Sequence, residues 1–365
     1  MPILPEDITQ IEKQKAMNSL IFLTEKKDGT IKARACANGS SQRKFIMKEE
    51  AASPTVTTEG LLTTCIIDAK QNRDIVTLDK PNAFVQTPLL TSKEQIIMTM
   101  DGKLVDLLDE IAPQRYSKFI QEENGSKKIY VVMERALYSM MMSSLLFYRH
   151  FRKDLESIGF RVNPYDMCIA NRKIEGHQQT VTWHVNNIKV SHINPKVNEN
   201  FCKWCEEKYG DDKNGKVKIH KGKVHNYLAM RLDYSTPNKV KIDMRDYCKQ
   251  VIEEYPYTIN NKVNCPWNAN LFSHDKDHKK LHKNASEIFH TYVMKCLFAA
   301  KWGRPDILTG ISYLSTKVLN PYNEDIKKLT RIISYLKNSI NICLTLEADD
   351  IREIKWYVNS SFGTH

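Results

Sequence analysis

The chain has 365 residues, 41% hydrophobic and 27% charged, a composition that excludes a disordered protein and is enough to bury sizeable cores in two or three subdomains. Lysine and arginine exceed aspartate and glutamate by 54 to 43, and the net charge of +11 favours polyanionic partners, with ordinary solubility charge as the alternative. No apolar run approaches the roughly 18 residues of a membrane span, no signal peptide opens the chain, and nine scattered cysteines do not form a disulfide scaffold, so an intracellular location is expected.

The first third of the chain predicts a strand that ends in a carboxylate. A turn at residues 27–29 between short strands is followed by a helical stretch over residues 58–69. The apolar run 75–78 predicts a strand, which Pro81 ends. Asp79 is therefore expected at the C-terminal end of that strand, where its side chain can reach a cleft.

The middle of the chain predicts a long helix and a hairpin. Apolar residues recur at helical spacing over residues 136–160, and Gly159 is a plausible end. Residues 179–185 and 188–192 are prone to form strands, with Asn186 and Asn187 at the predicted tip. Two asparagines also suit a simple turn, because asparagine tolerates left-handed backbone.

Helices dominate the last third. The expected elements are an amphipathic helix over 196–210, a polar loop over 211–215, strands over 216–220, 227–234, 239–243 and 353–358, and helices over 245–254, 285–300, 306–319 and 323–339.

Three of these segments resemble successive polymerase motifs of copia-type retrotransposon reverse transcriptases, and they occur in the same order. The motifs are Asp-Lys-Pro-Asn-Ala-Phe at 79–84, Arg-Ala-Leu-Tyr at 135–138 and Trp-His-Val-Asn-Asn at 183–187. Shorter pieces agree: Lys-Ala-Arg at 32–34, Ser-Pro at 53–54, Arg-Pro-Asp-Ile at 304–307 and Ile-Ser-Tyr-Leu-Lys at 333–337. The likeness spans roughly residues 20–365.

The resemblance implies an α+β fold of the right-hand polymerase type with an antiparallel palm sheet. Fingers and palm would occupy residues 1–245, a helical thumb and connection residues 246–345, and the truncated start of a ribonuclease H domain residues 346–365. Intact relatives add deoxynucleotides to a primer on an RNA or DNA template with Mg²⁺. The implied partners are therefore template-primer and deoxynucleoside triphosphates, with no membrane partner, and the oligomeric state stays open.

Nucleotidyl transfer requires two divalent cations, which need anionic oxygen ligands. By resemblance Asp79 is the first metal-binding aspartate, and the other two positions of the polymerase site are Asn186 and Asn187. Asn359 takes the place of the first ribonuclease H aspartate. An asparagine keeps an oxygen but carries no charge, so Mg²⁺ binding at Asp79 and Asn186 should be weakened and polymerase activity negligible.

The resemblance also implies a nucleotide pocket. Lys32 and Arg34 fall where cations lie near the triphosphate, although two solvated charges on a strand are the alternative. Tyr138 either stacks beneath the sugar or starts the helix. Ser139 replaces a helix-opening glycine, and Met142 replaces a glutamine that lies against the nucleotide.

Each aspartate-to-asparagine change requires only a single G-to-A substitution in the codon, so decay of a transposon copy is one hypothesis for the altered site. Deliberate substitution is the competing hypothesis, but it would not account for Ser139 or Met142.

Two alternatives to an enzyme remain open. The first is a non-enzymatic remnant that binds nucleic acid through its basic surface. The second is a zinc site, because the spacing of Cys202, Cys205, His220 and His225 fits a zinc-finger template, although both cysteines fall within a predicted helix. His274, His278 and His282 indicate a solvated helix face, and His184 is expected to be structural.

Overall fold

The computed structural model describes residues 1–25, 29–44, 46–89, 95–211, 215–260, 262–273, 279–350, 353 and 358. The ribonuclease H position Asn359, His274 and His278 lie outside these residues, as do most of the strand predicted over 353–358 and most of the turn at 27–29. Within them the chain forms three sheets and a set of helices, which confirms a mixed α and β fold. No described helix has the length and apolar character needed to cross a bilayer.

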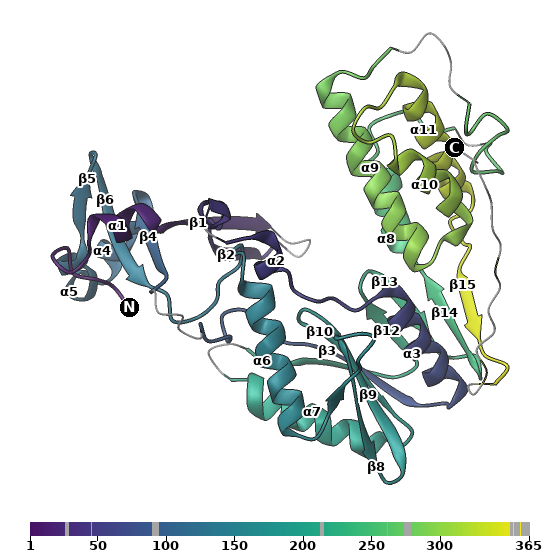
Figure 1. The fold of residues 1–365 in the computed structure, drawn as a ribbon, viewed down its shortest axis with the longest axis horizontal. Coiled ribbons are helices and arrows are strands. Elements are labelled where there is room, and N and C mark those ends of the chain that lie inside the picture. Colours follow the sequence, from purple (N-terminus) through teal and green to yellow (C-terminus); the bar gives the residue numbers. More distant parts are fainter. Residues whose placement is uncertain are drawn as a thin grey trace.

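The N-terminal arm is a five-stranded sheet in the order β2-β1-β4-β6-β5 (Figure 1). Its strands are β1 (Met17–Glu25), β2 (Ile31–Ala37), β4 (Ile97–Asp101), β5 (Gln121–Glu123) and β6 (Ser126–Val132). Its helical elements are α1 (Gln10–Lys15), α4 (Lys103–Ile111), α5 (Pro113–Tyr116) and η2 (Ser117–Phe119), with η1 (Ser41–Lys44) and α2 (Lys48–Ala51) after β2. Beyond its first residues β1 pairs only with β2, so this ribbon is mostly exposed.

The central sheet has six antiparallel strands in the order β11-β3-β10-β9-β8-β7. They are β3 (Asp74–Asp79), β7 (Arg161–Val162), β8 (Ile169–Ile174), β9 (His177–His184), β10 (Asn187–His192) and β11 (Lys218–Lys221). Helices α6 (Ser143–Ser157) and α7 (Pro195–Tyr209) cover the face that carries Trp183, because Phe151 of α6 meets the Trp183 ring at 5.5 Å. Helix α3 (Thr58–Lys70) covers the opposite face through Asp68, which binds Lys189 and Ser191 of β10.

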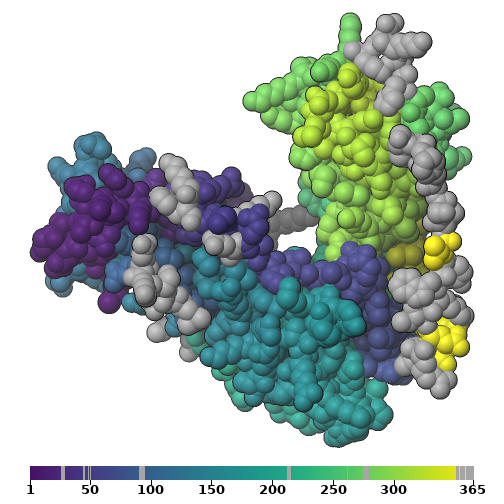
Figure 2. All heavy atoms as spheres, viewed as in Figure 1, coloured from purple at the N-terminus to yellow at the C-terminus, as the bar shows by residue number. Residues whose placement is uncertain are grey.

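The C-terminal part joins a small sheet to a helical bundle. The sheet contains β12 (Val224–Tyr227), β13 (Met230–Asp233), β14 (Lys239–Asp243) and β15 (Leu344–Glu347) in sequential order. The helices are α8 (Arg245–Glu253), α9 (Lys283–Trp302), η3 (Pro305–Ile307), α10 (Leu308–Ser315) and α11 (Asn323–Asn338). Figure 2 shows a wide hollow between this helical part and the N-terminal arm, with the central sheet and its helices below it.

Several predicted elements are corrected by the structure. The helix predicted over 136–160 begins only at Ser143, because the preceding residues form a loop that contacts β2. The strand predicted over 227–234 is a hairpin, since Leu228 and Ala229 take positive φ values of 50° and 61° and reverse the chain. The helix predicted over 306–319 is split into η3 and α10. Residues 97–132 form β4 to β6 and their helices, which the sequence patterns did not predict.

Candidate functional site

The three positions expected to form the polymerase centre converge at one end of the central sheet. Asp79 is the last residue of β3, and Asn187 opens β10 directly opposite it. The amide of Asn186 donates a hydrogen bond to the Asp79 carboxylate. The amide of Asn187 in turn donates to Asn186 Oδ1 at 3.5 Å. The antiparallel register therefore brings together residues that are more than 100 positions apart in the sequence.

The hairpin tip differs by one residue from the prediction. Asn187 pairs with His184, so the two-residue turn consists of Val185 and Asn186, and Asn187 belongs to the strand. Val185 has a φ of 53°, a backbone conformation that a β-branched residue rarely adopts. Strain of this kind persists only where the surroundings hold it, and it concentrates at functional sites.

The donor set does not fit a pair of divalent cations. Hard cations bind anionic oxygens, and Asp79 is joined here by two neutral amides, one of which directs an N–H group at the Asp79 carboxylate. Across the described part of the chain no three His, Cys, Asp or Glu side chains gather in a way that could hold a metal ion. The arrangement favours a hydrogen-bonded carboxylate over a metal centre.

A cleft of about 460 Å³ opens beside Asp79 between the central sheet and the β1–β2 ribbon. It brings together five of the predicted site residues, namely Asp79, Asn186, Lys32, Arg34 and Tyr138. Asn187, Ser139 and Met142 do not line it. Lys80, Lys216 and Lys218 add three cations that the sequence reasoning missed. Among the described lining residues five side chains are cationic types and one is acidic, so the cleft favours a polyanion.

The loop before α6 places Tyr138 in this cleft. The backbone N–H of Ala37 in β2 donates to the Tyr138 carbonyl at 3.0 Å and ties the loop to the ribbon. The Arg34 guanidinium then lies 5.9 Å from the Tyr138 ring centroid, and Phe84 meets the same ring edge-on at 5.0 Å. Tyr138 therefore does not start a helix, which removes that alternative.

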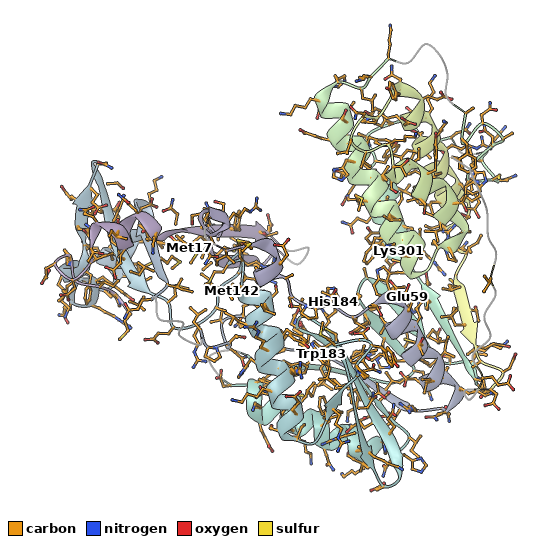
Figure 3. All side chains as sticks on the ribbon, in the orientation of Figure 1. Met17, Glu59, Met142, Trp183, His184 and Lys301 are labelled. Carbon is orange, nitrogen blue, oxygen red and sulfur yellow. The ribbon has the colours of Figure 1, made fainter. Side chains whose placement is uncertain are left out.

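Ser139 and Met142 occupy positions different from those expected. Ser139 has a φ of 70°, which glycine adopts without strain, and it lies in the loop, not at the opening of a helix. Met142 is the N-cap residue of α6 and supplies no side-chain hydrogen bond (Figure 3). Two of the missed lysines had a weak signal: Lys218 opens β11 and pairs with Asp79, and Lys216 lies two residues before it.

Lys80 is the unusual neighbour of this site, since only 1% of the residue is exposed. Its ammonium lies 3.7 Å from the ring centroid of Tyr209 and 5.0 Å from that of Phe147. It has no hydrogen-bond partner within the described residues. Desolvation lowers the pKa of Lys80 to about 8, against the attraction of Asp154. The Lys80 charge is therefore held by two aromatic rings and a distant carboxylate.

Replacing Lys80 with methionine is expected to stabilise the fold by about 2 kcal/mol at pH 7. A pKa reduced from 10.5 to about 8 corresponds to a penalty of about 3 kcal/mol, and the lost cation–π contacts offset about 1 kcal/mol. Because the pKa is lower in the folded state, the penalty is complete below pH 8 and fades as the pH rises toward 10.5. Urea unfolding of the unaltered chain and of the methionine variant across this pH range measures the difference in stability. A methionine variant that is less stable at every pH would contradict the prediction.

The zinc alternative finds no support in the geometry. His220 and His225 approach each other at 3.4 Å between their Nδ1 atoms, and His225 also bonds Thr77 at 3.3 Å. Cys202 and Cys205 lie buried within α7, where desolvation raises the pKa of both thiols. His282 caps α9, and partial burial lowers the pKa of His184 at the end of β9 (Figure 3).

Known proteins resemble the chain in sequence more clearly than in structure. It is 22% identical over 229 residues to a transposon Ty5-1 protein of Saccharomyces cerevisiae, covering 62% of this chain and 71% of that protein. It is also 22% identical over 344 residues to a retrovirus-related Pol polyprotein from transposon TNT 1-94 of Nicotiana tabacum, covering 89% of this chain but 23% of the polyprotein. No protein-family model matches.

These relatives show that the chain is similar to retrotransposon proteins. More particularly, it is related to the Pol region of such elements, which confirms the copia-type resemblance of its motifs.

Solved structures of telomerases share much lower similarity. Telomerase from Candida tropicalis, in complex with a TWJ fragment of telomeric RNA, is 10% identical with a TM-score of 0.33, covering 90% of this chain and 64% of that one. Telomerase from Candida albicans, also with a TWJ fragment, is 8% identical with a TM-score of 0.30, covering 93% and 63%. TM-scores this low do not establish a shared fold.

Proposed function

We propose that the chain is the reverse transcriptase region of a copia-type retrotransposon Pol protein in which the metal centre has lost its catalytic function. The central sheet would serve as the palm, the N-terminal arm as the fingers and the C-terminal helices as the thumb. Residues 346–365 would belong to the start of a ribonuclease H domain. An intracellular site of action follows from this proposal.

One observation carries the proposal: the Asn186 amide donates to the Asp79 carboxylate at the end of the hairpin. Aspartates at 186 and 187 would present three carboxylates at this point, whereas the chain presents one. Nucleotidyl transfer stabilises its transition state through two bridging cations, and a single shared carboxylate holds them poorly. Mg²⁺ binding would therefore be weak and primer extension close to absent.

The surrounding cleft supports binding of template-primer and deoxynucleoside triphosphates even without catalysis. Lys32 and Arg34 on β2 and Lys216 and Lys218 beside β3 would contact phosphate oxygens. The second candidate function, a purely binding remnant, rests on this excess of cations. An impaired polymerase would show residual nucleotide incorporation that is lost when Asp79 is replaced. A protein that only binds nucleic acid would show no such incorporation.

The unaltered chain is expected to bind a primed template with a steep salt dependence and to extend the primer no more than a reaction without protein does. Primer extension with Mg²⁺ and filter binding over a salt series measure the two properties. The Asp79→Asn variant should bind equally well or more tightly, because it removes the only acid among the described lining residues. Extension at the rate of an active polymerase would refute the proposed loss of function.

A further inference from the structure

A second polar surface lies at the outer edge of the central sheet, far along the strands from Asp79. Arg161 of β7 pairs with Asn171 of β8, and Asn171 pairs with Thr180 of β9. Paired residues project to the same face of a sheet. Lys173, two residues beyond Asn171 and opposite Gln178, also projects to this face. The edge of the face that α3 covers is therefore lined by basic and amide side chains.

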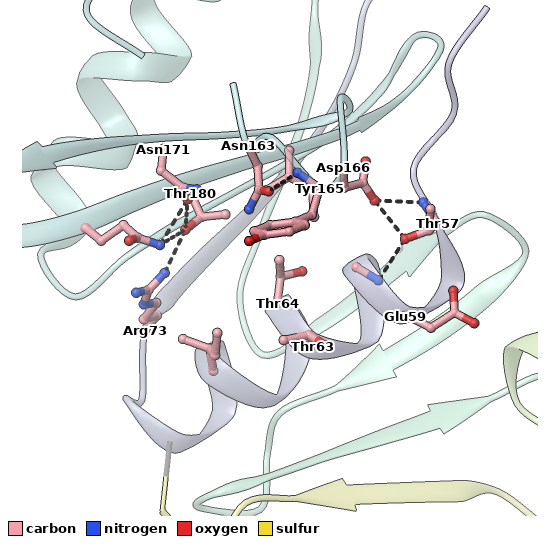
Figure 4. Close-up of a pocket in the computed structure, with 14 residues that line it drawn as sticks. Thr57, Glu59, Thr63, Thr64, Arg73, Asn163, Tyr165, Asp166, Asn171 and Thr180 are labelled. Atoms are coloured by element: carbon pink, nitrogen blue, oxygen red, sulfur yellow. Dashed lines mark hydrogen bonds between the residues drawn. The ribbon is translucent and has the colours of Figure 1, made fainter. Parts of the chain in front are cut away.

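Two hollows meet on this surface. One has a volume of about 350 Å³ and lies between α3 and the loop of residues 163–166 (Figure 4). The other, about 790 Å³, follows β7, β8 and the turn at Gly176. They share Asn163, Asn171 and Gln178, so we treat them as one feature, the edge groove. Each volume is within the ~300–1,000 Å³ typical of ligand sites.

The larger half of the edge groove is basic. Its lining contains Arg161, Arg172 and Lys173, and the described residues that line it include no carboxylate. Arg172 pairs with Gln179 and so projects to the opposite face, where it donates to the Gln179 side chain and to the Ile158 carbonyl, both at 2.8 Å. On the groove face the charge comes from Arg161 and Lys173, and because the described lining of this half has no carboxylate, an anion would complement it.

Positive charge also lies beneath the smaller half. Arg73, only 4% exposed, lines this half and donates to Thr180 Oγ1 at 3.1 Å. Its ion-pair partner Asp68, at 3.6 Å, also binds Lys189, so one buried carboxylate serves two buried cations. This buried positive charge offsets part of the negative charge of Glu59 and Asp166, which line the same half.

The smaller half offers an aromatic ring and polar side chains, which include two carboxylates, the exposed Glu59 and the buried Asp166. Tyr165 is 95% exposed, and in Figure 4 its ring lies between Asn163 and Thr64. Asp166 is engaged, because it accepts hydrogen bonds from Thr57 and from the Cys168 N–H. An exposed ring beside a basic groove is the combination that binds single strands, through base stacking and phosphate contacts.

We propose that the edge groove binds single-stranded nucleic acid, with phosphates against Arg161 and Lys173 and a base stacked on Tyr165. The groove and the Asp79 cleft share no lining residue. Gln178 and His184 lie at opposite ends of β9, six residues or about 20 Å apart. The inference is therefore independent of whether the cleft catalyses or binds anything.

Binding of a fluorescent 20-nucleotide single strand, measured by anisotropy over a salt series, tests the proposal. Arg161→Ala with Lys173→Ala should make the slope of log affinity against log salt shallower by about 1.4, because each phosphate contact on a single strand contributes about 0.7. Tyr165→Ala should weaken binding about tenfold at every salt concentration and leave the slope unchanged, because stacking releases no counterions. All three substitutions remove exposed side chains.

The matched control is Arg115→Ala with Lys118→Ala, which removes the same two residue types from an exposed segment of the N-terminal arm. The measurements are repeated in a background that carries Lys32→Ala and Arg34→Ala, which removes the contribution of two cleft cations to the measured affinity. The groove effects should persist in that background. If the groove variants bind the strand as tightly as the control variant does, the proposal is overturned. The same result is expected if the groove binds a protein partner instead of nucleic acid.

Discussion

Replacing Asn186 and Asn187 with aspartate is expected to produce Mg²⁺-dependent primer extension at least about 100-fold above the unaltered chain. The double replacement removes the N–H group that faces Asp79 and raises the number of carboxylates from one to three. A 100-fold gain corresponds to about 3 kcal/mol of transition-state stabilisation, a modest part of what bridging cations supply. Single-nucleotide incorporation on a primed template measures the gain.

Recovery should be partial, because Met142 and the strained Ser139 remain. Adding Ser139→Gly should improve it, since glycine adopts a φ of 70° without strain. Two controls separate metal binding from simple charge. Asp79→Asn in the restored protein should abolish extension, and Asn82→Asp, which adds a carboxylate elsewhere on the cleft wall, should give none. A restored protein that binds template-primer but stays at background would show that the metal positions do not limit activity.

Replacing Asp68 with asparagine is expected to destabilise the fold by about 3–5 kcal/mol. Asp68 is 1% exposed beneath the central sheet, where it pairs with Lys189 and with Arg73 and accepts from Ser191 Oγ at 2.6 Å. Its loss leaves two cations buried against Thr180 and Ser191 without a carboxylate. The attraction of Asp68 also outweighs desolvation and raises the pKa of Lys189. Urea unfolding measures the free energy lost.

The expected loss is specific to the buried network. Asp246→Asn changes an exposed carboxylate in the first turn of α8 and should alter stability by no more than about 0.5 kcal/mol. Adding Lys189→Met to Asp68→Asn should recover part of the stability, because only Arg73 then remains buried without its partner. A loss below 1 kcal/mol for Asp68→Asn would show that water reaches the network.

Five of the residues that the motifs singled out line one cleft, whereas the elements around them were predicted less well. Asp79 ends its strand as the Pro81 break predicts, and α3, α7, α8, α9 and α11 lie within a few residues of their predicted ranges. The loop before α6 was missed because it contacts β2, a residue pairing that no local pattern encodes. Residues 97–132 were missed because short strands that pair with distant partners have little periodicity of their own.

By itself the sequence determined the family resemblance, the basic charge and the single carboxylate left among the three metal positions, because motif order and residue identity need no coordinates. Only the tertiary structure decided that an Asn186 amide hydrogen-bonds Asp79, that Lys80 is buried between aromatic rings, and that Arg161 and Lys173 share a groove with Tyr165. These features depend on strand register and on which face each side chain occupies. Register is fixed by pairing between distant segments, so no local stretch of the chain contains it.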